Sequence, residues 1–393
     1  MILDTRFPPD IRVEKEIETL KIDNEIFILC PAYSDQKDEE KNKDFKIFRK
    51  IKGIRRWMGR LQLMKDCYSI IWEKEVDLFV KENKIDVIHV HDLPLVGICV
   101  KIAQKYNLRI IADLHENYPA MLRLSQRKSI FKETSLGSLA IRLVLNIIKW
   151  EKFEVSILKE VDQIVVVVEE AKNRLVSLGF DPLNISVVGN YSSMNIITYE
   201  KKTKINNCLN LLYAGYFSET RDLYTLIDSI KILELENYPN LRVVLAGGSG
   251  KAFKSIVNYI KLHSLENRIS VFEWMSLTDA QNLMLKADIG LVPHVKSPHT
   301  DATIPHKLFQ YMQRGLPVIV SNCTPLERIV KEASCGVVYE SGNSKSLAEC
   351  ISMFYKDPTL IKKMGVSGRD LVEMKYNWNE AGTVLSNVYS KFN

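Results

Sequence analysis

The sequence lacks the patterns that mark disulfide-stabilised, zinc-binding or membrane-spanning proteins. Its seven cysteines are scattered, odd in number and never form a Cys-x-x-Cys pair, so they support neither a disulfide framework nor a zinc site. The apolar stretches 164–168 and 138–150 are too short or, at Arg142, too interrupted for the roughly 20 apolar residues that a bilayer span requires. The first residues lack the basic flank and apolar core of a signal peptide. These absences predict a cytoplasmic protein.

Signals for nucleic-acid binding and for a bound metal are also missing. No segment combines aromatic and basic residues in the manner of a DNA- or RNA-binding motif, and there is no Asp-x-Asp pair. The formal net charge of +6 is modest for 393 residues. It indicates an anionic ligand or surface without requiring nucleic acid.

Short apolar runs alternate with amphipathic helical patterns, which predicts an α/β fold with parallel sheets. We expect two Rossmann-like domains facing each other across a cleft, at 1–195 and 205–375, followed by a helix at 376–393 that returns to the first domain. The polar stretch 192–207 is the expected linker. Met1 to Asp4 resembles a shortened first strand, and Asp10 is a plausible N-cap for a helix over 11–20. The remaining expected strands are 26–29, 86–90, 109–112 and 164–168 in the first half, and 209–214, 242–246, 269–272, 289–292 and 317–320 in the second.

A strongly basic segment interrupts the first half. Residues 41–65 contain ten Lys or Arg and one acid, Asp44. Apolar side chains recur among them at roughly helical spacing, namely Phe48, Ile51, Trp57, Met58 and Leu61. Two interpretations stay open: a patch for an anionic membrane or acceptor, or a solvated basic helix packed by its apolar face.

Two basic residues follow predicted strands in the second half, at the edge where ligands of such sheets bind. Lys307 stands in the first turn of a helix that begins near Pro305, where the free N–H groups and the helix dipole attract anions. Lysine is unfavourable there unless an anion is present, so we expect a phosphate, with an ordinary surface lysine as the alternative. Arg221 follows the strand that ends at Gly215 and could add a bidentate phosphate contact. The glycine-rich turn 247–250 allows either close ligand approach or simply a tight turn.

Polar side chains also follow two strands of the first half. His89 and His91 could share one strand face, but no third ligand is evident, so we expect no metal and a structural role for His89. His115, with its neighbours Asp113 and Glu116, is the better candidate for contact with a sugar.

Together these stretches resemble the family 4 glycosyltransferases, which are retaining enzymes of the GT-B fold. The resemblance covers nearly the whole chain and is strongest in PHKLFQYMQRGLPVIVS at 305–321. It extends to CGVVYESGNSKSLAECI at 335–351 and to YNW at 376–378. RFPPDIRVEKE at 6–16, DVIHVHDLP at 86–94 and DLHENYP at 113–119 resemble the first domain of one branch of the family.

The resemblance implies a role for each matching residue. His115 would contact the donor sugar, while Arg221 and Lys307 would hold the donor diphosphate. Gln310 occupies the place of the second glutamate of the family's Glu-x7-Glu motif, which holds the ribose. The first domain would bind the acceptor and the second the nucleotide-sugar. Further expected donor contacts are Gly215, Pro305 and His306, and expected sugar or acceptor contacts are Asp92, Glu116, Asp301 and Thr303.

Two departures from the family pattern affect the predicted site. The first glutamate of the motif falls on Ala302, and Tyr216 replaces an arginine that many members carry. We expect a metal-independent transferase without a cofactor, using a UDP- or GDP-linked sugar and a glycan or lipid-linked glycan acceptor, with peripheral membrane contact through 41–65. The alternatives are a nucleotide-sugar epimerase of the same fold and a catalytically silent binding subunit.

Overall fold

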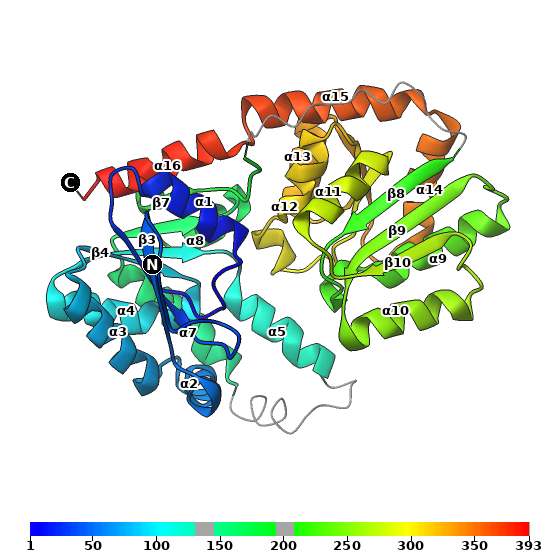
Figure 1. Cartoon of the computed structure of the whole chain (residues 1–393). Coiled ribbons are helices and arrows are strands. Elements are labelled where there is room, and N and C mark those ends of the chain that lie inside the picture. The colour runs from blue at the N-terminus through cyan, green and yellow to red at the C-terminus, as the bar shows by residue number, and fades with distance from the viewer. Residues whose placement is uncertain (130–144, 194–207, 393) are drawn as a thin grey trace. The chain divides into compact units, whose positions relative to one another are not determined.

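The computed structural model describes residues 1–129, 145–193 and 208–392, and it divides into two compact units. Unit 1 comprises Met1–Gly189 with Ala381–Asn393, and unit 2 comprises Asn190–Glu380. The expected linker lies mostly outside the described residues, at 194–207, as does the part of the apolar stretch 138–150 up to residue 144. Each unit is described by itself (Figure 1).

One continuous sheet runs through unit 1. Three strands, β1 (Ile26–Pro31), β3 (Phe45–Lys50) and β2 (Glu39–Lys41), lie in the order β1-β3-β2. Four more follow the order β4-β5-β6-β7, namely β4 (Val87–His91), β5 (Arg109–Leu114), β6 (Gln163–Val166) and β7 (Ile185–Val187). Ile2 joins the two groups through parallel bridges to Leu29 and Val90. All ladders are parallel except β2 with β3.

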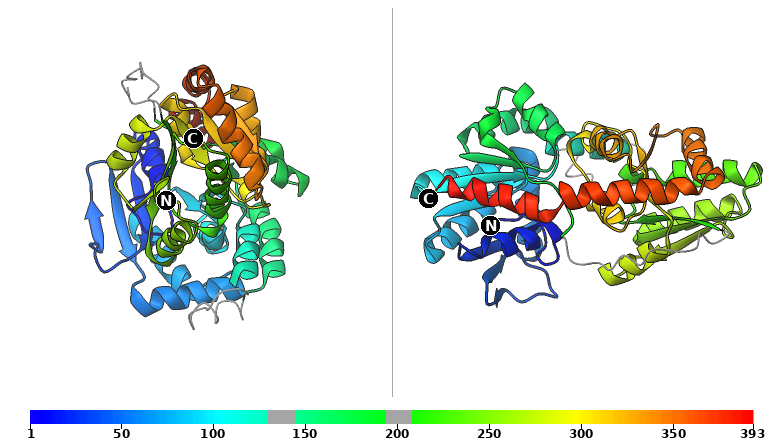
Figure 2. Two further views of the ribbon diagram at one scale, coloured as in Figure 1. Left: turned by 90° about the vertical axis from the view of Figure 1, so that its right-hand side faces the viewer. Right: turned by 90° about the horizontal axis from the view of Figure 1, so that it is seen from above.

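Helices of unit 1 follow the strands and bury their apolar sides. The Asp10 carboxylate accepts hydrogen bonds from the amides of Arg12 and Val13 and so caps α1 (Ile11–Leu20). The C-terminal helix α16 (Trp378–Ser390) is the last red helix in Figure 2. Its Tyr389 lies against His89 of β4, and the following Lys391 binds Gln163 of β6. The other helices are α2 (Gly53–Asp66), α3 (Ile70–Asn83), α4 (Leu93–Tyr106), α5 (Tyr118–Ser129), α7 (Ile147–Ile157), α8 (Glu169–Ser177) and the short η1 (Leu158–Glu160) and η2 (Pro182–Asn184).

Unit 2 contains a parallel sheet of six strands in the order β10-β9-β8-β11-β12-β13. The central strands β11 (Ile289–Val292) and β12 (Val318–Ser321) are buried throughout, as expected of strands covered on both faces. The others are β8 (Leu209–Ala214), β9 (Leu241–Gly248), β10 (Ile269–Glu273) and β13 (Gly336–Tyr339). The helices are η3 (Glu219–Arg221), α9 (Leu223–Leu235), α10 (Gly250–Leu262), α11 (Leu277–Lys286), η4 (Thr300–Ala302), α12 (His306–Gln313), α13 (Thr324–Ala333), α14 (Ser344–Lys356) and α15 (Thr359–Met374).

The structure corrects two local predictions. The basic segment 41–65 is not one helix, because its first part is the end of β2 and all of β3, and only 53–65 belongs to α2. Of the apolar residues at helical spacing, Trp57, Met58 and Leu61 do lie on α2, whereas Phe48 belongs to β3. Pro305 is the N-cap of α12 rather than its first residue, since its ψ of 139° is extended. Within the described residues, every helix is too short or too polar to cross a bilayer.

Candidate active site

Lys307 lies at the edge of the unit 2 sheet where its strands end. It is in the first turn of α12, and its side chain is only 9% exposed. The Nζ atom has no hydrogen-bond partner and lies 3.7 Å from the centroid of the Tyr213 ring. Burial, with a further contribution from Arg221, holds the pKa of Lys307 well below its usual value. A buried lysine amine with no hydrogen-bond partner is the strongest sign of a ligand site in this unit.

Arg221 is the second cation at this edge. It ends the short helix η3, two residues before α9 begins, and Asp222 between them has a left-handed backbone with φ of 36°. An Nη1 atom of Arg221 lies 2.5 Å from Nε2 of His294. Burial lowers the pKa of His294 well below normal, and the nearby Arg221 and Lys307 lower it further. The imidazole is therefore neutral and accepts a hydrogen bond from the guanidinium of Arg221. His294 therefore positions Arg221 beside Lys307.

Glycine at 215 allows this approach. It has φ of +148°, and a Cβ there would collide with Nζ of Lys307. A Cβ at Gly247 would lie 2.6 Å from the carbonyl oxygen of Gly215. Gly247, the first glycine of the 247–250 turn, therefore allows the ends of β8 and β9 to pack closely. This packing agrees with the interpretation of 247–250 as a tight turn.

The remaining predicted residues of unit 2 differ in their surroundings. Gln310 is partly exposed on α12, one helical turn after His306. Ala302 is buried, and Thr303 beside it is partly exposed. The Asp301 carboxylate accepts from the amide of Thr324 at 2.7 Å and pairs with Lys296 at 3.2 Å. Asp301 is therefore engaged in capping α13.

In unit 1 the predicted residues His115 and Asp92 meet where β4 and β5 end. The Asp92 carboxylate accepts from the His115 amide at 3.1 Å, and its other oxygen lies 3.4 Å from Nδ1 of the imidazole. Burial alone would lower the pKa of His115, but the carboxylates of Asp92 and Asp113 outweigh it and raise the pKa to about 10. His115 is thus a cation with about one fifth of its side chain exposed. Glu116 follows in the loop before α5 and is partly exposed.

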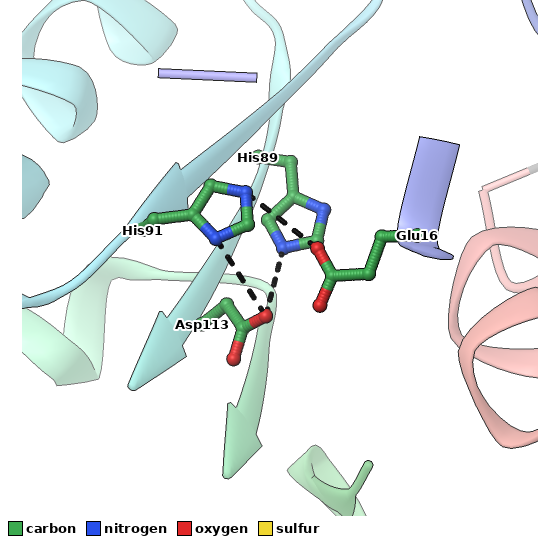
Figure 3. A group of neighbouring side chains, drawn as sticks. All are labelled: Glu16, His89, His91 and Asp113. Atoms are coloured by element: carbon green, nitrogen blue, oxygen red, sulfur yellow. Dashed lines mark ion pairs between the residues drawn. The ribbon is translucent and has the colours of Figure 1, made fainter. Parts of the chain in front are cut away.

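Beneath His115 lies a buried polar cluster (Figure 3). Nη2 of Arg12 lies 2.9 Å from both oxygens of Asp113. His89 and His91 of β4 stack on each other with ring centroids 4.6 Å apart, and Glu16 of α1 faces them. Arg12 holds the pKa of Asp113 well below normal against the opposing effect of burial, whereas burial raises that of Glu16 well above normal.

Sequence reasoning missed several of these neighbours. His294 follows β11 after a single proline, so the rule that led to Arg221 would also have selected it. Glu16 and Tyr389 gave no such signal, because they lie on helices far from β4 in the chain and only the fold brings them to His89 and His91. No third ligand for the two histidines was evident in the sequence, and the structure places the carboxylates of Glu16 and Asp113 beside them.

Comparisons with known proteins agree with this architecture. YtcC of Bacillus subtilis (strain 168), named as a glycosyltransferase, is 29% identical over 198 residues, covering 49% of this chain and 47% of the relative. The capsular polysaccharide biosynthesis glycosyltransferase CapM of Staphylococcus aureus is 23% identical over 58% of this chain and 61% of its own. The chain thus spans about half to three fifths of these curated relatives.

The fold matches along the full length. The crystal structure of Anabaena HepE in complex with UDP has a TM-score of 0.70 at 13% identity, covering 99% of each chain. The family model for glycosyl transferases group 1 matches residues 196–371, and that for glycosyltransferase family 4 matches residues 19–191. The chain belongs to the group 1, family 4 glycosyltransferases and has their GT-B fold.

Proposed function

We propose that this protein transfers a sugar from a UDP- or GDP-linked donor to a glycan or lipid-linked glycan. The observation that carries the proposal is the buried Nζ of Lys307, which has no hydrogen-bond partner and lies near Arg221. Family membership makes a nucleotide-sugar the natural anion for this site, and HepE binds UDP in its crystal structure. The name of CapM supports an acceptor in surface polysaccharide synthesis.

The proposed chemistry is mainly electrostatic. As the bond between the anomeric carbon and the diphosphate breaks, Lys307 and Arg221 stabilise the negative charge that grows on the leaving group. Backbone amides at the start of α12 can add further donors. Two fixed cations supply the charge that a metal would otherwise provide, so we propose that donor binding needs no added Mg²⁺. Retention at the anomeric carbon is proposed from the family resemblance alone.

Further contacts are proposed for the sugar and the ribose. Gln310, through its amide, would pair with the ribose hydroxyls. His115, as a cation, would contact the donor sugar, with Asp92 fixing its orientation. Gly215 and Pro305 would line the donor site and Thr303 the sugar, while Asp301 is a weaker candidate because it caps α13.

One experiment separates transfer from the alternatives. Purified protein is incubated with a panel of UDP- and GDP-sugars, with and without a membrane extract containing lipid-linked glycans, and released nucleotide is measured. We expect release from one donor that depends on the extract, together with labelled glycolipid. An epimerase would convert the donor sugar without an acceptor, and a silent binding subunit would only show thermal stabilisation by the nucleotide.

A further inference from the structure

Four buried side chains of unit 1 direct polar atoms toward one another. They are His89 and His91 of β4, Asp113 of β5 and Glu16 of α1, and each is 2% exposed or less (Figure 3). Each residue offers one potential ligand atom, and these four atoms all lie within 4.8 Å of one another.

Several of these atoms have no hydrogen-bond partner. They are Nε2 of His89, Nε2 of His91 and Oε2 of Glu16, which faces His91. Native proteins leave few buried polar atoms unsatisfied, and each such atom requires an explanation. A single cation at the centre would satisfy the two histidine nitrogens and Oε2 together.

The opposite sides of the same groups are already engaged. Nδ1 of His89 lies 2.8 Å from the Tyr389 hydroxyl, and Nδ1 of His91 lies 3.2 Å from Nε2 of His115. Coordination through Nε2 of His91 places the His91 proton on Nδ1, so metal binding requires His115 to release its Nε2 proton and accept from His91. Arg12 pairs with Oε1 of Glu16 at 2.9 Å and with both oxygens of Asp113. Outer partners of this kind fix the orientation of metal-binding histidines and carboxylates.

Distances within the cluster suit a tetrahedral ion. Nε2 of His89 lies 3.5 Å from Oδ2 of Asp113, and Nε2 of His91 lies 3.7 Å from Oε2 of Glu16. Bonds of about 2.1 Å from zinc to nitrogen or oxygen place neighbouring tetrahedral ligands about 3.4 Å apart. These two pairs need only a small contraction, whereas the wider separations of up to 4.8 Å and the nearly parallel imidazole planes require the side chains to rotate toward the ion.

We propose that Glu16, His89, His91 and Asp113 bind one divalent transition-metal ion, with Zn²⁺ the best match. Two imidazoles exclude Mg²⁺ and Ca²⁺ as preferred ions, because these take oxygen ligands, whereas imidazole suits zinc. The site is structural: it joins α1, β4 and β5 directly, and α16 through Tyr389. It is separate from the proposed diphosphate site, which lies in unit 2.

The test uses the full chain after treatment with a chelator and dialysis. Zn²⁺ is titrated by calorimetry, and Co²⁺ is titrated by visible absorption, which reports tetrahedral coordination. We expect one ion per chain and a higher melting temperature. Glu16→Gln and His89→Gln should abolish stoichiometric binding, and Tyr389→Phe should weaken it about 10- to 100-fold through loss of an outer partner. His263→Gln, which changes a histidine of unit 2, should leave binding unchanged.

Two results would overturn the proposal. One is the absence of stoichiometric binding to the wild-type chain, in which case buried water satisfies these atoms. The other is binding that persists in both Glu16→Gln and His89→Gln, which places the ion elsewhere. Circular dichroism shows whether each variant is folded. If Glu16→Gln or His89→Gln does not fold, the weaker zinc binding expected of Tyr389→Phe tests the site instead. UDP and GDP titrations of the same samples report on the donor site alone, so failure of one proposal is distinguishable from failure of the other.

Discussion

At the scale of single residues, the most informative side chain is Lys307. Burial favours its neutral form, and Arg221 nearby disfavours a second positive charge. Both effects act against the charged state until an anion arrives. The same reasoning explains why His294, between the two cations, is neutral and serves as an acceptor for Arg221.

This environment predicts that binding of a nucleoside diphosphate takes up a proton. The pKa of Lys307 is low in the free protein and rises when a diphosphate lies beside it, so protons bind at every pH between the two values. Calorimetry in two buffers of different ionisation enthalpy measures the uptake. Lys307→Met should lose it. Equal apparent enthalpies in both buffers would show that Lys307 is already charged or is not in the site.

Gln310 gives a second prediction at this scale. An amide can donate to and accept from ribose hydroxyls, and a carboxylate at the same place can accept from both. We therefore expect Gln310→Glu to retain or improve donor use, measured as kcat/KM for the donor. A folded Gln310→Glu protein that no longer binds donor would mean that the site has adapted to a neutral side chain.

At the scale of elements, the sequence predicted the buried strands well and missed some of the edge strands. The fully buried β11 and β12 appear as continuous apolar runs, and Asp10 marks the start of α1. The partly exposed edge strands β7 and β13 were not predicted, although the edge strand β10 was. Strand β3 was also missed, because its side chains alternate between burial and partial exposure and form no apolar run.

The basic segment is less available for membrane contact than its composition suggests. Four of its cations, in and next to β3, pair with acids outside the segment, Lys46 with Glu25, Arg49 with Glu40, Lys50 with Glu39 and Lys52 with Asp38. In α2, Arg55 pairs with Glu75. Helix α2 is different, because Ile54, Trp57 and Met58 are 74%, 44% and 44% exposed along one side.

We therefore predict that α2 carries whatever membrane affinity the protein has. Wild-type protein should float with liposomes containing anionic lipid and not with neutral ones, and Trp57→Ala with Ile54→Gln should reduce its recovery. Ile22→Gln, which alters an apolar residue that is 78% exposed elsewhere in unit 1, is the matched control. Equal recovery of wild type from both liposomes, or none from either, leaves α2 as a solvated helix.

At the scale of the whole molecule, each unit carries its own set of strand ends, with His115 at one and Lys307 at the other. The alternating pattern of the chain was enough to predict two such sheets and the residues that follow each strand. It could not predict pairings between distant helices and strands, such as Tyr389 with His89, since no local pattern encodes them. The clustering of Arg221, His294 and Lys307 likewise depends on the fold.

The central claim is that Lys307 and Arg221 hold the diphosphate of a nucleotide-sugar. The most direct test is calorimetric titration of UDP and GDP into wild type, Lys307→Met and Lys286→Met, the last changing an exposed lysine at the end of α11. We predict that Lys307→Met lowers the affinity for whichever of UDP and GDP binds the wild type by about 10- to 100-fold, because a hydrogen bond to a charged group contributes about 1.5–3 kcal/mol. Lys286→Met should match wild type. Wild-type affinity in Lys307→Met, and likewise in Arg221→Ala, would contradict the account and place the phosphate site elsewhere.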